Sequence, residues 1–455
     1  MSALEQLGRW IATSAPVAKE LRERIELHLI DTVGALIAST ATAEGRLLLQ
    51  FRDQLRHNTG AGIAIDVATR CALARLSEID DIHLASMTTA GAIVIPAVLS
   101  LAAANPSAEG DVTVSAILAG YEAMIRLGLA IDGPTVRYRG IWPTYLAAPF
   151  GVAAAAARLL KLDAKQSANA LALALTSAAP GVGQHHAVGT SRWLAVGNAA
   201  SNGLTAALAA QARFTSDVDL MEGNFFHSVY GMAVSPGELT DGLGAGSVLT
   251  DVSFKPWCAA RQTMAATQAL REIIDNGVRP KEIDRIRVWV LPPHRKMIDH
   301  DVKSGDRASH LTSVAFCMAA EALAAHGTAA PGLSPPDPSQ HARDFMAKIT
   351  VEPDQSLLAQ YPRHWPARIE VEAGSARYQR VVTAIPGDPA RPFDRVKVHQ
   401  KFARFAGPIV GAERTEQLFR CCRDALTGGD PAAIVEEIER ACQAALHQVE
   451  SEAHT

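Results

Sequence analysis

The stretch Glu78-Ile-Asp-Asp-Ile-His83 places four ionisable side chains within six residues, and residues 84–105, which follow it directly, carry no charge. A charge at the mouth of an apolar segment is costly to bury unless it is paired or used in chemistry. The block from Glu78 to His83 is therefore the first place to look for a functional site.

Residues 84–105 approach the length that a helix needs to cross a bilayer. Polar and helix-bending residues such as Thr88 and Pro96 interrupt them, however, and alanine outnumbers leucine. We therefore expect a helix that is buried on all sides in a helical domain. Alanine-rich stretches of low charge at 141–157 and 166–191 predict further helices that pack closely.

The overall composition narrows the class of protein. Of the 455 residues, 48% are hydrophobic and 20% are charged, and the net charge of -4 argues against a nucleic-acid partner or an anionic membrane surface. The six cysteines lack the regular spacing of metal ligands, which predicts reduced, mostly buried thiols and no metal site. Residues 5–30 have helical periodicity and do not resemble a signal peptide, so we expect one amphipathic helix there and a cytoplasmic protein.

The chain is longer than one hydrophobic core usually supports, which predicts two domains. Charges become denser after about Met264, and alternating stretches at 286–291, 367–372 and 378–383 predict strands. Helical periodicity returns near the C-terminus. The sequence thus predicts a mainly α protein, with an all-helical domain formed by residues 1–264 and 400–455 and a smaller α+β domain formed by residues 265–399.

Common cofactor and nucleophile motifs are absent from the sequence. It contains no Walker loop, no GxSxG, no HExxH and no glycine fingerprint between a strand and a helix. A cofactor-independent acid/base enzyme or a binding protein remains.

Several blocks, in order and spacing over nearly the whole chain, resemble the MmgE/PrpD family. They are Glu78-Ile-Asp-Asp81, Gly91-Ala-Ile-Val-Ile-Pro96, Gly120-Tyr-Glu122, Phe150-Gly-Val-Ala153, Gly197-Asn-Ala-Ala200, Glu222-Gly223 and Lys255-Pro-Trp-Cys258. The resemblance implies a large helical domain and a smaller α+β domain, an active site in the cleft between them, and a homodimer. Known activities in the family are 2-methylcitrate dehydration, cis-aconitate decarboxylation and iminodisuccinate epimerisation, none of which requires a metal.

The resemblance also implies roles for particular cations. Lys255 occupies the position of an active-site lysine, and Arg192 lies five residues before Gly197, where the family usually has another lysine. Cations at these positions would hold substrate carboxylates and stabilise an enolate-like anion. Arg261 is a candidate second carboxylate clamp. For all three residues the alternative is ordinary exposure to solvent.

The acidic block supplies the candidate acids and bases. By position, Glu78 corresponds to the family's active-site aspartate, while Asp81 and His83 are further candidates for proton transfer. For Asp81 and its neighbour Asp80, the alternative is helix capping or a salt bridge to Arg75. His83 can titrate near neutrality, although a structural histidine is the commoner case.

The sequence departs from the family pattern at its usual histidines. Thr89 and Trp142 stand at two of these positions, and Phe316 replaces a tyrosine. We expect Thr89 and Trp142 to contact a substrate that is less charged or bulkier than those of the family, although Trp142 can instead fill the core. His186, next to His185 in an uncharged loop, is a candidate to replace a lost base.

These features predict a cofactor-independent lyase that abstracts a proton next to a carboxylate or carbonyl of a small organic acid. An isomerase or epimerase that uses the same proton abstraction is one alternative. A family member that binds an acidic ligand and catalyses nothing is another, and its signature would be Trp142 and Phe316 in the cleft without convergent ionisable groups.

Overall fold

The structure is a computed structural model that describes residues 1–13, 16–60, 62–105, 110–179, 181, 189–324 and 332–453. Contacts divide the chain into two compact units. Unit 1 comprises Met1–Val252 together with Asp394–Thr455, and unit 2 comprises Ser253–Phe393. The domain boundaries expected from the sequence, after residue 264 and before residue 400, stay predictions.

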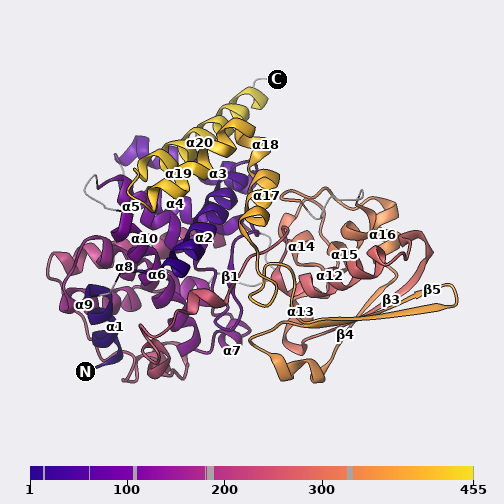
Figure 1. The fold of residues 1–455 in the computed structure, drawn as a ribbon, viewed down its shortest axis with the longest axis horizontal. Helices are drawn as coiled ribbons and strands as arrows, with labels where there is room; N and C mark the ends of the chain where they lie inside the picture. Colours follow the sequence, from indigo (N-terminus) through magenta and orange to yellow (C-terminus); the bar gives the residue numbers. More distant parts are fainter. Residues whose placement is uncertain are drawn as a thin grey trace. The chain divides into compact units, whose positions relative to one another are not determined.

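Unit 1 is built almost entirely from helices, as the sequence predicts (Figure 1). In chain order its α-helices are α1 (Ala3–Thr13), α2 (Lys19–Ser39), α3 (Ala43–Thr59), α4 (Ile63–Leu76), α5 (Gly91–Ala103), α6 (Gly110–Ala130), α7 (Gly133–Arg137), α8 (Pro143–Leu159), α9 (Ala164–Thr176), α10 (Ser191–Gln211), α11 (Phe225–Tyr230), α17 (Arg395–Phe405), α18 (Gly407–Val410), α19 (Ala412–Ala425) and α20 (Ala432–Ala453). Its short elements are β1 (Ile82–His83), η1 (Pro236–Leu239) and η2 (Val248–Asp251), and β2 (Val252–Ser253) lies where the chain passes from unit 1 into unit 2.

Small residues bring the central helices of unit 1 close together. Helix α8 packs against α6 and α10, and α10 also packs against α4. A Cβ atom at Gly203 of α10 would lie 2.3 Å from the carbonyl oxygen of Pro149 in α8, so only glycine fits this crossing. The alanine-rich stretch at 141–157 therefore lies mostly in a tightly packed core helix, α8, as expected. The stretch at 166–191 is helical up to Thr176, where α9 ends, and residues 180 and 182–188 lie outside the described residues.

Two helices begin or end where the sequence-based expectation differs. The single helix expected over residues 5–30 is two helices, because Pro16 lies between α1 and α2 and cannot continue a helix. The helix expected over residues 84–105 begins only at Gly91. Hydroxyl groups before it bond locally, with Ser86 Oγ 2.7 Å from Thr88 Oγ1, and such bonds compete with helix formation.

One helix among the described residues is long and apolar enough to cross a membrane, and it is α6. Of its most apolar window, 89% is buried inside the structure, which is typical of a core helix.

Unit 2 is a four-stranded sheet covered by helices. Its elements are α12 (Arg261–Asp275), η3 (Pro280–Glu282), β3 (Ile283–Val290), α13 (Pro292–Ile298), α14 (Arg307–Thr312), α15 (Val314–Leu323), α16 (Gln340–Met346), β4 (Ile349–Pro353), η4 (Gln355–Gln360), β5 (Ala367–Ala373) and β6 (Ala376–Val382). The strand order is β4-β3-β5-β6. Strands β3, β5 and β6 confirm the three predicted strands, whereas β4 was not predicted.

Strand β3 alternates buried and partly exposed side chains from Ile286 to Val290. Strand β3 runs parallel to β4, with Ile286 opposite Ile349, and antiparallel to β5, with Val288 opposite Ile369. The buried residues of β3 and β5 join those of α12 and α15 in one hydrophobic core. This arrangement confirms the predicted α+β fold of the smaller part.

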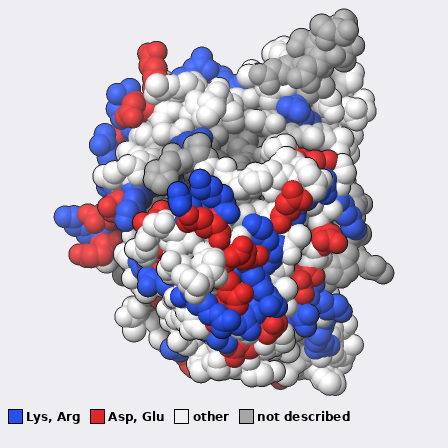
Figure 2. Space-filling model, turned by 90° about the vertical axis from the view of Figure 1, so that its right-hand side faces the viewer, with Lys and Arg blue, Asp and Glu red and all other residues white. Residues whose placement is uncertain are grey.

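Charges of both signs are interspersed on the face of the molecule drawn in Figure 2. In unit 2, Arg287 on β3 pairs with Glu370 on β5, and Arg368 on β5 pairs with Asp354. On this face, positive side chains therefore have negative side chains close by.

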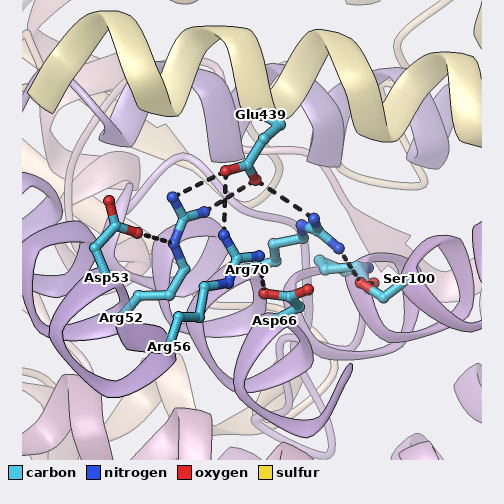
Figure 3. A network of polar contacts seen from close by, with 8 residues as sticks. Arg52, Asp53, Arg56, Asp66, Arg70, Ser100 and Glu439 are labelled. Atoms are coloured by element: carbon cyan, nitrogen blue, oxygen red, sulfur yellow. Dashed lines mark hydrogen bonds and ion pairs between the residues drawn. The ribbon is translucent and has the colours of Figure 1, made fainter. Parts of the chain in front are cut away.

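The C-terminal helix α20 is held to the rest of unit 1 by ion pairs with arginines (Figure 3). Glu439 of α20 pairs with Arg52 at 2.9 Å, Arg56 at 3.4 Å and Arg70 at 3.5 Å. Burial alone would raise the pKa of Glu439, but the three guanidinium groups lower it. Three acidic side chains, Asp53, Asp66 and Glu439, balance the three arginines.

We predict that Glu439→Gln destabilises the protein by about 1–3 kcal/mol, between the values for exposed and for buried ion pairs, because three arginines lose their shared anion. Urea unfolding measures this change. The matched control is Glu436→Gln on the same helix, whose side chain is 66% exposed and pairs with Arg440. Equal stability of the two variants would contradict the structural role of Glu439.

Candidate active site

Glu78 lies in the segment between α4 and α5 and has an unusual backbone conformation. Its φ angle is +57°, in the left-handed region that non-glycine residues rarely adopt. Ser77 supports this turn, because its hydroxyl donates to the carbonyl of Ala74 (2.7 Å) and accepts from the N–H of Ile79 (3.2 Å). Backbone strain of this kind persists only where the surroundings fix it, and it is frequent at functional sites.

Of the three carboxylates in the acidic block, only that of Glu78 reaches solvent. Its side chain is 20% exposed, whereas those of Asp80 and Asp81 are 0% exposed. Arg75 pairs with Glu78 at 3.0 Å and with Asp80 at 3.3 Å. Burial opposes the charge of Arg75, but Asp80 and Glu78 raise its pKa above the usual value. Asp80 thus forms the salt bridge to Arg75 that was considered as the alternative to a catalytic role.

Asp81 points into the core of unit 1. Its Oδ1 accepts from the N–H of Gly91 at the start of α5 (2.9 Å), its Oδ2 accepts from the hydroxyl of Tyr121 (2.7 Å), and His28 Nδ1 lies 2.8 Å from Oδ2. Burial raises the pKa of Asp81, but the contacts with His28, Tyr121 and Gly91 outweigh burial and lower it. This geometry agrees with the capping alternative, and these contacts account for both carboxylate oxygens of Asp81.

A lysine from the C-terminal part of unit 1 holds the same segment. Lys401 Nζ in α17 donates to the carbonyl of Ile79 (2.6 Å) and lies 2.6 Å from Oδ1 of Asp31. Burial raises the pKa of Asp31 despite this contact with Lys401. Asp81 and Lys401 therefore fix the backbone on the C-terminal side of Glu78.

His83 is buried beside the same segment. Its Nδ1 lies 2.9 Å from the hydroxyl of Ser86. Burial lowers the pKa of His83 to about 4, so the ring is neutral at neutral pH. The expectation that His83 titrates near neutrality is therefore wrong, because the side chain has too little contact with water to stabilise its charge.

Thr89, one of the positions that depart from the family pattern, contacts the start of α8. The N–H of Thr89 donates to Oγ1 of Thr144 (3.2 Å), and the two hydroxyl oxygens are 3.3 Å apart. Thr144 is the second residue of α8, directly after Trp142-Pro143. The structure thus brings Thr89 close to the first turn of α8, in which Trp142 is the N-cap residue.

Tyr145 lies in the first turn of α8, and several charged side chains influence its pKa. The side chain is fully buried, and its ring makes a T-shaped contact with Trp142 at 5.3 Å. The guanidinium of Arg137 lies 3.9 Å from the ring centre of Trp142. The Tyr145 hydroxyl interacts electrostatically with the positive charges of Arg75, Arg192 and Arg137 and with the negative charge of Glu78.

Burial sets the ionisation of these groups. It raises the pKa of Tyr145 to about 12, although the arginines oppose the rise. It lowers the pKa of Arg137 to about 10, and the positive charges of Arg75 and Arg192 lower it further. We call this group the Tyr145 cluster, and it consists of Arg75, Glu78, Asp80, Arg137, Trp142, Tyr145 and Arg192.

The Tyr145 cluster contains three residues expected from the sequence, Glu78, Trp142 and Arg192. Sequence reasoning does not identify Tyr145, and it treats Arg75 only as a partner of the aspartates. The position of Tyr145, one residue after the Trp142-Pro-Thr144 block, is the signal that could have found it.

The two candidates in unit 2 are both buried. Lys255 is 2% exposed, so the alternative that it faces solvent is wrong. Arg261, the first residue of α12, is also buried, and its Nη2 lies 2.6 and 2.9 Å from the two oxygens of Asp388. The carboxylate that Arg261 binds in the structure is thus an internal one, that of Asp388, and not that of a substrate.

His186 lies outside the described residues. Among the residues that are described, no group of three His, Cys, Asp or Glu side chains is arranged to hold a metal ion.

Two family models match this chain. The model of the MmgE/PrpD N-terminal domain matches residues 5–230, and that of the MmgE/PrpD C-terminal domain matches residues 257–424. The chain belongs to the MmgE/PrpD family. This confirms the resemblance, and with it the two-domain MmgE/PrpD fold class.

The MmgE/PrpD N-terminal match contains the whole Tyr145 cluster, and Lys255 lies two residues before the start of the C-terminal match. A search of curated proteins finds no significant match. Membership in the MmgE/PrpD family, which includes dehydratases, therefore defines the class of protein without naming its substrate.

We predict that Asp81→Asn destabilises the protein by about 2–4 kcal/mol, because the amide presents a donor where Asp81 accepts in a buried site. Urea unfolding measures the loss. The control is Asp111→Asn, whose side chain is 80% exposed and which should change stability by less than about 0.5 kcal/mol.

The stability of the native protein and that of Asp81→Asn should depend differently on pH. Because the pKa of Asp81 is lower in the folded state than its ordinary value of 3.8, its contribution to stability is present above that value and is lost as pH falls through the folded pKa. Below about pH 4 the native protein should therefore lose stability more steeply than Asp81→Asn. Parallel pH profiles would contradict the role of the Asp81 carboxylate.

Proposed function

We propose that this protein is a cofactor-independent lyase that abstracts a proton next to a carboxylate or carbonyl of a small organic acid. The observation that carries the proposal is the state of Glu78. Its backbone is strained, and its partly exposed carboxylate lies beside arginines. A carboxylate held in a defined position is the kind of group that moves a proton in such reactions. Family membership supports the enzyme class, because the family includes dehydratases.

The proposal assigns complementary roles to the cations. Removing a proton next to a carboxylate builds negative charge on the substrate, and preorganised cations stabilise that charge. Arg192, which belongs to the Tyr145 cluster, and Lys255, which is buried in unit 2, are assigned this role. Lys255 takes the role from its position in the block that resembles the family's lysine block.

The non-catalytic alternative is less well supported. Its expected signature is Trp142 and Phe316 without convergent ionisable groups, but Trp142 lies against Arg137 and within the Tyr145 cluster. Phe316 packs against His310 inside unit 2, with ring centres 4.8 Å apart. The ionisable groups around Trp142 favour a site that performs chemistry.

An isomerase or epimerase that uses the same proton abstraction remains the second candidate function. Elimination needs an acid for the leaving group, whereas epimerisation needs proton donors on two faces of the substrate. Incubation of the pure protein with a panel of 3-hydroxy acids and 2-enoic acids in deuterated water, followed by ¹H NMR, separates the two. Loss or addition of water identifies the lyase, and deuterium exchange without net change identifies the isomerase.

We predict that Glu78→Gln and Lys255→Ala each lower turnover by about 10²–10⁴-fold, because one removes the proton-transfer group and the other removes a stabilising cation. Steady-state rates on an acid from this panel measure the effect, and circular dichroism checks the fold. The control Glu436→Gln should leave turnover unchanged. If both site variants retain turnover, these assignments are wrong. If the native protein converts none of the acids, the result contradicts the proposal that it is an enzyme.

The sequence-based expectations for partners belong to the same proposal. We expect a small carboxylic acid as substrate, no nucleic-acid or membrane partner, and a homodimer in the cytoplasm. Light scattering on the purified protein tests the dimer.

A further inference from the structure

Helix α10 has an exposed face without charged side chains. Within Ser191–Gln211 the exposed residues are Ser191, Leu194, Asn198, Thr205, Leu208 and Gln211, and none of them carries a charge. The sequence around the helix is equally uncharged, since residues 166–211 contain Arg192 and no other Lys, Arg, Asp or Glu, although 20% of the whole chain is charged. A helix face that stays in water usually carries charged residues, so this face is typical of one that is covered.

Five residues of α10 form one continuous row. Leu194, Asn198, Ser201, Thr205 and Leu208 follow one another at intervals of four and three residues, which keeps them on one side of a helix. Ser201 is partly exposed and the other four are exposed. The leucine side chains at the two ends are 40% and 41% exposed. We call these five residues the α10 row.

An exposed aromatic ring follows the C-terminal end of the row. Phe214, three residues after the end of α10, is 65% exposed. Its N–H donates to the carbonyl of Ala209 (2.9 Å), so the chain turns back against the last turn of the helix. Phe214 therefore adds apolar surface at this end of α10.

Two hydrogen bonds connect α10 to α11 through residues that follow α9. The amide of Asn202 donates to the carbonyl of Ser177 (3.2 Å), and the hydroxyl of Tyr230 donates to the carbonyl of Ala178 (3.0 Å). Val229, next to Tyr230 in α11, is 57% exposed. An uncharged and partly apolar surface therefore reaches from α10 toward α11.

The α10 row is nearly symmetric about its centre. Leu194 and Leu208 lie seven residues before and after Ser201, while Asn198 and Thr205 lie three before and four after it. Two copies of α10 that cross antiparallel at Ser201 would bring Leu194 against the partner's Leu208 at both ends, and Asn198 against the partner's Thr205. A two-fold axis requires a surface that matches itself in this way. Because the row is uncharged, no like charges meet across the axis.

We propose that the α10 row packs against the same row of a second copy of this chain and forms the centre of a two-fold homodimer. The inference rests on the proposed function, because it names the surface that forms the homodimer expected there. The leucines bury apolar area, and the smaller polar residues between them let the two helices approach closely. In this arrangement the C-terminal end of one α10, followed by Phe214, lies beside the N-terminal end of the other, which carries Arg192.

Charged substitutions in the row test this dimer. Leu208→Glu and Leu194→Lys should each weaken dimerisation at least tenfold, because each places an unpaired charge in a desolvated interface. The double variant Leu194→Lys/Leu208→Glu should dimerise more tightly than either single variant, because opposite charges then face each other across the axis. Light scattering on a dilution series of the full chain measures the dissociation constants, and circular dichroism checks the fold.

A cross-link tests the position of the axis. Ser201→Cys replaces a small residue by another small one, and the two new thiols of a dimer would lie close enough for a disulfide. Under mild oxidation a non-reducing gel should show a covalent dimer. The control Gln54→Cys, at an exposed position of α3, should stay monomeric on the same gel, as should the native protein.

Leu47→Glu is the matched control for Leu208→Glu. Leu47 is a leucine of α3 with 49% exposure, and its substitution should leave the dissociation constant unchanged. A native dimer that Leu208→Glu leaves intact, or that Leu47→Glu dissociates, would overturn the α10 surface and keep the homodimer. A monomeric native protein would overturn both.

The surface and the proposed reaction can fail separately. A dimer that depends on Leu208, together with no turnover of any acid in the NMR panel, would keep the α10 surface and remove the reaction. Turnover that depends on Glu78, in a protein whose mass Leu208→Glu does not change, would keep the reaction and remove the surface.

Discussion

One buried carboxylate, that of Asp81, joins three helices of unit 1 to the segment that carries Glu78. Its oxygens contact the start of α5, Tyr121 of α6 and His28 of α2. Gly91 is required at this point, because a Cβ atom there would lie 2.5 Å from Asp81 Oδ2. In a medium of low dielectric such bonds are strong and their loss is costly, so the segment has little freedom to move. The strained conformation of Glu78 depends on this constraint.

Much of the fold could be predicted from the sequence, because periodicity and composition report burial directly. The helical core and strands β3, β5 and β6 follow from those patterns. Strand β4 did not, since it has five residues and only Val351 among them is buried. Pro16 and the hydroxyl-rich residues before Gly91 shortened helices that hydrophobic spacing alone would have extended.

The candidate site was less predictable, because its geometry depends on residues far apart in the chain. Spacing cannot reveal which of Glu78, Asp80 and Asp81 faces solvent, since the answer depends on a positive φ angle and on partners such as His28 and Lys401. The same reason hides Tyr145.

The chain leaves unit 1 after Val252 and returns to it at Asp394. Lys401, which holds the carbonyl of Ile79, belongs to the returning segment, as does Glu439. A ribosome makes the chain from its N-terminus, so residues 1–252 emerge without these two anchors and remain without them while the whole of unit 2 is synthesised. The carbonyl of Ile79, next to Glu78, therefore gains its hydrogen bond from Lys401 only at the end of translation. A truncated chain that lacks the last sixty or so residues would keep the contacts of Asp81 but lose this one.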